Sequence, residues 1–182
     1  LKTRSRFSAT SIDQLPHHVV SMHLFGHMLR IPVPDVNHTK YMLIIGGNPL
    51  ASNGSIMTAP NMRQKLKDIK ARDGKVVVID PRRTETAEIA STHHFIRPAT
   101  DVLLLLAMLN EIYLQGYANK GHAKENRAAS LAPEIDRIAS FAKDYTAESV
   151  ASITGITAVE IKRFVKEFFE SECAVCYVRL CV

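Results

Sequence analysis

The sequence has few of the features that would mark a membrane-bound or secreted protein. None of its 182 residues is tryptophan, aromatic residues make up 7%, and no run of eighteen apolar residues occurs. A membrane-spanning helix needs about 20 consecutive apolar residues, so no membrane span is expected. No signal peptide is visible. The chain begins with Leu1 and not with methionine, which indicates an excised or processed piece.

Cysteine is also scarce, and all three cysteines lie near the C-terminal end. Cys173 and Cys176 form a C-x-x-C pair, but positions three apart on a strand point to opposite faces, which disfavours a zinc or redox pair. Together with Cys181 they are expected to be buried free thiols in a reducing cytoplasm, so the protein is predicted to be cytoplasmic. No P-loop, catalytic triad or paired-carboxylate site can be picked out.

The chain carries a net charge of +5 and has a pI of about 9.2. The positive charges are scattered, and the few aromatic residues offer no stacking surface, so a nucleic-acid partner is not expected. An anionic cofactor, or a face complementary to other domains, explains the basic balance equally well.

What the sequence does contain is a set of apolar strands that each end in polar residues. Residues 42–45 read MLII, an unbroken apolar run that is typical of a strand buried on both faces. Gly46 and Gly47 follow and let the backbone turn sharply and approach a ligand closely. Donors that suit phosphate or ribose come next, at Asn48, Ser52, Asn53 and Ser55. The turn departs from G-x-G-x-x-G, so it either binds a ligand or is only a tight turn.

A second apolar strand at Val76–Ile79 ends on Asp80. A carboxylate at this position can accept hydrogen bonds from both hydroxyls of a ribose. Arg82 and Arg83 follow and could pair with phosphates. The alternative is an Asp-Pro turn with two solvated arginines. The combination of strand, acid and arginines after a glycine turn favours a nucleotide.

These patterns predict an α/β fold with a mostly parallel sheet flanked by helices, of the Rossmann-like kind. Strands are expected near 42–46, 76–79, 94–96 and 175–180. Helices are expected at 11–28, 61–72, 84–90, 102–114, 146–152 and 158–170. Asp101 is the expected N-cap of the helix that starts at Val102, and Thr157 and Glu160 are expected to form a capping box. Residues 1–40 are predicted to be a helix and loop packing from a neighbouring part of a larger enzyme, and 41–182 the α/β domain.

Three motifs together resemble the molybdopterin oxidoreductases, the dimethyl sulfoxide reductase family. They are G-x-N-P-x-x-S at 46–52, D-P-R-x-T-x-T-A after the strand at 80–87, and R-P-x-T-D before a helix at 97–101. A fourth stretch, Y-T-x-E-x-V-x-x-I-T-G at 145–155, is similar to a helical segment of formate dehydrogenases. The order and spacing fit, and the resemblance covers nearly the whole chain.

The resemblance implies molybdenum or tungsten held by two molybdopterin guanine dinucleotides, one of which this chain would bind. The matching cofactor-binding positions are Gly46, Gly47, Asn48, Pro49, Ser52, Ile79, Asp80, Arg82, Arg83, Thr100 and Asp101. A carboxylate such as that of Asp101 suits guanine, because it can accept from N1–H and the exocyclic amine together. Ala99 stands where the family usually has glycine, so a positive φ there would strain the loop.

The resemblance also places a metal ligand before the first strand, where formate dehydrogenases carry cysteine or selenocysteine. This chain has no cysteine there, and Ser11 or Asp13 could take the role, although both are equally suited to cap a helix. His23 and His27 lie four residues apart on one helix face, but a helix that lines a cavity is favoured over a metal site.

The predicted function is that of a cofactor-binding fragment from a formate dehydrogenase-like catalytic subunit. By resemblance, the iron–sulfur cluster belongs to a missing N-terminal region, and the partners are the remaining domains of the same enzyme and an electron-transfer partner. The fragment alone is expected to be inactive. Two alternatives are a free-standing nucleotide-binding α/β module without metal and a non-catalytic interaction fragment.

Overall fold

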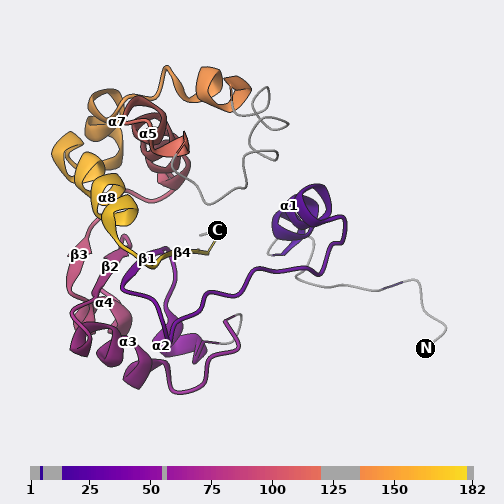
Figure 1. The fold of residues 1–182 in the computed structure, drawn as a ribbon, viewed down its shortest axis with the longest axis vertical. Helices are drawn as coiled ribbons and strands as arrows, with labels where there is room; N and C mark the ends of the chain where they lie inside the picture. The colour runs from indigo at the N-terminus through magenta and orange to yellow at the C-terminus, as the bar shows by residue number, and fades with distance from the viewer. Residues whose placement is uncertain (1–4, 6–13, 55–56, 120–135, 180–182) are drawn as a thin grey trace.

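A four-stranded parallel sheet forms the centre of the computed structural model, which describes residues 5, 14–54, 57–119 and 136–179. The strands stand in the order β3-β2-β1-β4. Their bounds are β1 Tyr41–Ile45, β2 Lys75–Ile79, β3 Thr92–His94 and β4 Ala174–Val178. Helices lie on both sides of the sheet (Figure 1). The predicted α/β fold with a parallel sheet is therefore confirmed.

The two central strands are buried on both faces, as their unbroken apolar runs predicted. In β1, Leu43 and Ile45 face one core cluster, whereas Met42 and Ile44 face the other. The same alternation holds in β2, and all the apolar side chains from Val76 to Ile79 have no exposed surface. This period of two is what a pleated strand dictates. Polar groups are consequently confined to the strand ends.

The two faces of the sheet carry different helical layers. One face is covered by α2 Pro49–Ser52, α3 Met62–Ala71 and α4 Glu85–Ile89. The other is covered by α5 Asp101–Leu114, α7 Ala147–Thr154 and α8 Ala158–Glu170, with the short 3₁₀ turn η2 at Tyr117–Asn119. Residues 136–142 are helical too. The helices that connect β1 to β2 and β2 to β3 therefore cover one face of the sheet. The helices between β3 and β4 cover the other face.

The helix ends test two sequence predictions. The capping box of α8 is confirmed, because the Thr157 side chain accepts from the Glu160 N–H while the Glu160 carboxylate accepts from the Thr157 N–H. The predicted N-cap of α5 is wrong by one residue: Thr100 holds the cap position, and Asp101 is the first helical residue. There Asp101 still favours the helix, since a carboxylate in the first turn complements the helix dipole.

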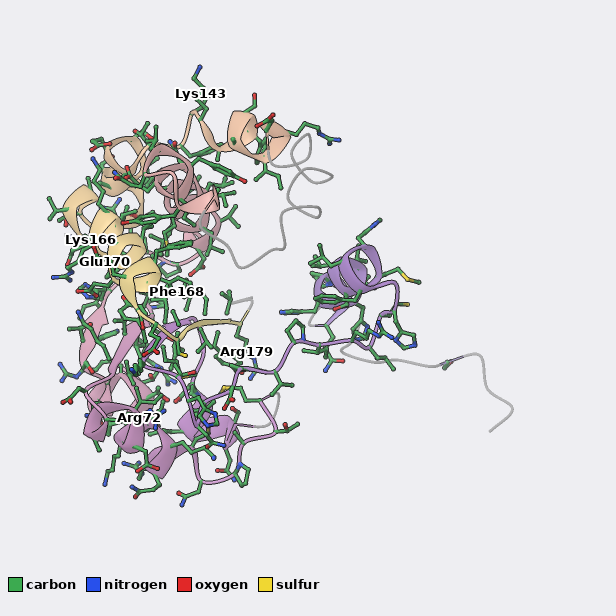
Figure 2. All side chains as sticks on the ribbon, in the orientation of Figure 1. Arg72, Lys143, Lys166, Phe168, Glu170 and Arg179 are labelled. Carbon is green, nitrogen blue, oxygen red and sulfur yellow. The ribbon has the colours of Figure 1, made fainter. Side chains whose placement is uncertain are left out.

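The N-terminal helix α1 is shorter than predicted, at Leu15–Phe25, with Pro16 in its first turn as expected. It stands apart from the sheet (Figure 1), and most of its apolar residues, such as Leu24 and Val20, are exposed. The segment from α1 to β1 is fastened close to the sheet by Arg72 (Figure 2), whose guanidinium donates to the carbonyls of Val36 and Thr39. Across the described ranges, no helix has the length and apolar character that crossing a bilayer requires.

The prediction of buried cysteines is wrong for the two that can be assessed. Cys173, which precedes β4, and Cys176, which lies in β4 at the edge of the described sheet, are both exposed and free. Cys176 lines an apolar groove together with Phe168 of α8 and Leu43 of β1. Cys181 lies outside the described residues.

Two glycines offer a matched test of packing after α2. Gly54 and Gly116 share a φ of +68°, but a Cβ on Gly54 would lie 2.4 Å from the Ala59 carbonyl oxygen, whereas one on Gly116 would meet no atom within 4 Å. Gly116→Ala should therefore lose only the left-handed strain of about 1 kcal/mol. Gly54→Ala should lose about 1–3 kcal/mol more through overpacking. Urea denaturation of the 182-residue chain measures both losses, and equal losses would contradict the packing described here.

Candidate functional site

The parallel register brings the ends of the strands to one edge of the sheet. Ile45 pairs with Ile79 and with Val178, and Ile79 pairs with His94. Beyond these pairs, the Gly46 N–H donates to the Ile79 carbonyl at 2.9 Å, and the Asp80 N–H donates to the His94 carbonyl at 3.1 Å. The glycine turn and the acid that the sequence singled out are therefore neighbours on this edge.

The strand order also marks one place on that edge. From β1 the chain builds outward to β2 and β3 on one side, and it returns to add β4 on the other side. In open parallel sheets, ligands bind at the carboxyl edge where the order reverses in this way. The reversal falls at β1, so the turn after Ile45 lies at it. Arg179, just past the end of β4 (Figure 2), borders the same place, and its N–H donates to the Ile45 carbonyl.

Backbone conformation and packing explain why positions 46 and 47 are both glycine. Gly46 has a φ of +63°, which a glycine adopts without strain. A Cβ on Gly47 would lie 2.8 Å from the ring of Tyr177 and 3.3 Å from Ile44 Cγ2. Packing against β4 alone thus requires glycine at position 47. Sequence reasoning missed Tyr177, which sits far along the chain.

The Asn48 side chain is engaged at both ends by α4. Its amide nitrogen donates to Glu85 Oε2 at 2.7 Å, and its amide oxygen accepts from Thr86 Oγ1 at 2.7 Å. The hydrogen bond from Asn48 is the main cause that lowers the pKa of the exposed Glu85 carboxyl. Pro49 and Ser52 belong to the short helix α2, with Pro49 buried. A ligand role for these three residues stays a prediction.

Asp80 directly follows the last residue of β2. It is nearly buried, with 7% of its surface exposed. Its Oδ1 accepts the Arg82 N–H at 2.8 Å, which fixes the turn after the strand. A carboxylate offers about four acceptor sites, so capacity remains for hydroxyl or N–H donors of a ligand. The side chains of Arg82 and Arg83 are exposed beside it. An acceptor next to two cations fits a group that carries both hydroxyls and phosphates.

The R-P-A-T-D turn is built by contacts within the chain. The Arg97 guanidinium donates to the Ser152 carbonyl of α7 at 2.8 Å, and Thr100 Oγ1 donates to the Arg97 carbonyl at 2.7 Å. Ala99 has a φ of +63°, so this position does take the conformation that favours glycine. Asp101 is half-buried at the start of α5.

The end of β3 carries a histidine next to α8. His94 Nδ1 lies 2.9 Å from Glu160 Oε1, and the His94 ring packs edge-on against Phe164. Burial lowers the pKa of His94 more than the Glu160 carboxylate raises it. The imidazole is therefore neutral near pH 7, and its contacts join β3 to the helical layer instead of contributing charge to the edge.

No metal site is formed by the part of the chain that the structure describes. Nowhere in it do three or more His, Cys, Asp or Glu residues gather so that they could hold an ion. Ser11 and Asp13, the predicted alternatives for a metal ligand, lie outside the described residues.

Comparison with known proteins identifies one matching family and several similar proteins. The family model described as molybdopterin oxidoreductase matches residues 2–169. Formate dehydrogenase H of Escherichia coli is 27% identical over 142 residues, which are 78% of this chain and 18% of that protein. The molybdopterin-containing subunit of the arsenate respiratory reductase of Chrysiogenes arsenatis is 31% identical over 163 residues, covering 79% of this chain and 19% of that protein.

A solved structure shows the same fold. Acetylene hydratase from Pelobacter acetylenicus superposes with a TM-score of 0.62 at 24% identity, covering 82% of this chain and 19% of that one. The chain therefore spans about a fifth of the length of the relatives it matches.

The left-handed Ala99 can be tested by a pair of glycine substitutions. Ala99→Gly removes the strain of about 1–2 kcal/mol that a Cβ causes at positive φ. Ala151→Gly, inside α7, should instead lose about 1 kcal/mol of helix stability. Both variants gain the same freedom in the unfolded chain, so the Ala99→Gly protein should be the more stable of the two by at least about 1 kcal/mol in urea denaturation. Equal stabilities would mean that Ala99 carries no strain.

Proposed function

The chain belongs to the molybdopterin oxidoreductase family, and from that premise we propose that it is the segment of a catalytic subunit that holds one molybdopterin guanine dinucleotide. The observation that carries the proposal is the carboxyl edge of the sheet, where the glycine turn after β1 and Asp80 after β2 are joined through the Gly46 N–H and the Ile79 carbonyl. This edge has the position and the chemistry that a dinucleotide needs.

Each part of the edge is given a distinct role in this proposal. Backbone groups of the turn from Gly46 to Ser52 face the cofactor, and the open glycine backbone lets it come close. Asp80 accepts hydrogen bonds from ribose hydroxyls, while Arg82 and Arg83 pair with the diphosphate. Thr100 and Asp101 bind the guanine end, where a carboxylate can accept from two N–H groups.

Family membership implies a molybdopterin cofactor with molybdenum or tungsten. When bound, the metal supplies the redox chemistry, and the protein supplies binding, orientation and electrostatics. We propose that the complete enzyme resembles the formate dehydrogenases in its reaction. In this proposal, other domains of the polypeptide complete the cofactor-binding site. Electrons leave through an iron–sulfur centre to a partner protein. We further propose that residues 1–40 pack against those domains, which the exposed apolar surface of α1 supports.

The role of Asp80 can be tested without disturbing its turn. In Asp80→Asn the side-chain oxygen can still accept the Arg82 N–H, but the charge and part of the acceptor capacity are lost. A hydrogen bond to a charged group contributes about 1.5–3 kcal/mol, so cofactor affinity in the complete enzyme should fall at least about tenfold. The measurement is guanine and metal content per folded protein after purification.

Asp73→Asn is the matched control for this prediction, because Asp73 is exposed and lies at the opposite end of β2. It should leave the cofactor content unchanged. Full cofactor occupancy in Asp80→Asn as well would remove Asp80 from the proposed site.

Purification of the 182-residue chain by itself distinguishes the proposed function from the alternative of a free-standing nucleotide-binding module. As a segment of a larger cofactor-binding site, it should hold no molybdenum or tungsten after purification and show no oxidoreductase activity. Elemental analysis and absorption spectroscopy of the purified chain provide the test. Bound flavin or nicotinamide would favour the free-standing module, and stoichiometric metal would show that the chain is sufficient by itself.

A further inference from the structure

Two of the sequence motifs contact each other through a cluster of three side chains, Asn48, Glu85 and Thr86. Asn48 belongs to the turn after β1, and the other two open the helix α4 that follows β2. Asn48 and Thr86 are 38 positions apart in the sequence, yet Thr86 Oγ1 donates to Asn48 Oδ1 at 2.7 Å. We call these three residues the turn anchor.

Thr86 is the buried centre of the anchor. It has no exposed surface, and its hydroxyl both donates to Asn48 Oδ1 and accepts the Leu50 N–H at 3.2 Å. A hydroxyl has one donor and two acceptor sites, so one group holds the turn on both sides of Pro49. The backbone of the turn is thereby fixed to α4 as well as to its own strand.

Glu85 fixes the orientation of the Asn48 amide. Its Oε2 accepts from Asn48 Nδ2 at 2.7 Å, while Thr86 donates to the other end of the same amide. Only one orientation of the amide satisfies a carboxylate acceptor on one side and a hydroxyl donor on the other. To bind a ligand through this amide, Asn48 would have to give up at least one of these two bonds.

The anchor also reaches the second strand end. Thr86 lies in the first turn of α4, which Thr84 caps by accepting the Ala87 N–H, and the turn before it is fixed by the bond between Asp80 and the Arg82 N–H. A change in the position of α4 would thus move the glycine turn and the Asp80 turn together. The anchor and the Thr84 cap thus connect the two halves of the carboxyl edge.

We propose that the turn anchor is a positioning device for the cofactor: Asn48, Glu85 and Thr86 bind no ligand themselves but hold the turn of residues 46–52 in the geometry that the dinucleotide meets. The inference rests on the proposed function, because it concerns the same site. It assigns Asn48 to the support of the turn and names two supporting residues, Glu85 and Thr86, outside the predicted site.

A charge exchange across the anchor tests this directly in the complete enzyme. Asn48→Asp places a second carboxylate against Glu85 and should raise the cofactor release rate about tenfold, as expected when hydrogen bonds at the turn are lost. The double variant Asn48→Asp with Glu85→Gln restores an amide opposite a carboxylate, and Thr86 can still donate to the exchanged side chain. Its release rate should return to within about threefold of the starting protein.

Substitutions of Thr86 provide a second test, in which a variant that keeps the hydroxyl should preserve the function of the anchor. Thr86→Val removes the hydroxyl and should speed hydrogen exchange of the Leu50 amide about tenfold and release the cofactor faster, while Thr86→Ser should preserve both. Thr154→Val is the matched control, since Thr154 is equally buried and its hydroxyl also makes both kinds of bond, donating to the Val150 carbonyl and accepting the Ile156 N–H. It should lower stability without changing cofactor release.

The outcomes separate the anchor from the proposed function. If Asp80→Asn loses the cofactor but the double variant stays as defective as Asn48→Asp, then Asn48 is a ligand contact and the anchor proposal is overturned. If Thr154→Val releases the cofactor as fast as Thr86→Val, general destabilisation explains the effect and the proposal also fails. If neither Asp80→Asn nor any anchor variant alters cofactor binding, the proposed function itself is wrong.

Discussion

The site depends on the parallel pairing of β1 with both of its neighbours. Because β1 and β2 are buried on both faces, the sheet tolerates only apolar side chains between their ends. Hydrogen bonding in register then brings Ile45 level with Ile79 and Val178. Every polar group that follows these positions is placed on one edge, at the point where the strand order reverses. The clustering of polar groups at this edge is therefore a consequence of the apolar core between the strand ends.

The features that sequence could predict are those set by local patterns. The apolar runs of β1 and β2 and the capping box of Thr157 and Glu160 depend on residues within a few positions, and the structure confirms them. The left-handed backbone at Ala99 agrees with a motif in which glycine is usual, although the sequence raised a positive φ there only as a condition. The edge position of Gly46 and Asp80 needed only the rule that polar residues follow buried parallel strands. Whether these residues bind a cofactor remains a prediction.

What sequence could not predict depends on contacts between distant segments. The ring of Tyr177 under Gly47 and the hydroxyl of Thr86 on Asn48 arise only once the sheet and α4 are assembled. The exposure of Cys176, on an edge strand of the described sheet, is likewise not revealed by a local pattern. The error of one residue at Asp101 has a different cause, since threonine and aspartate both suit a cap and neighbouring turns decide between them.

These contacts change how the motifs are interpreted. A motif residue invites the inference that it touches a ligand, yet Asn48, Thr86 and Arg97 bond to other parts of the chain. These bonds form within the chain and involve no bound molecule. Asp80 differs, because its carboxylate fixes one turn and keeps further acceptor capacity. The neighbouring arginines are exposed. Under the proposed function the motif residues therefore divide into two sets, one that builds the edge and a smaller one, centred on Asp80, that meets the cofactor.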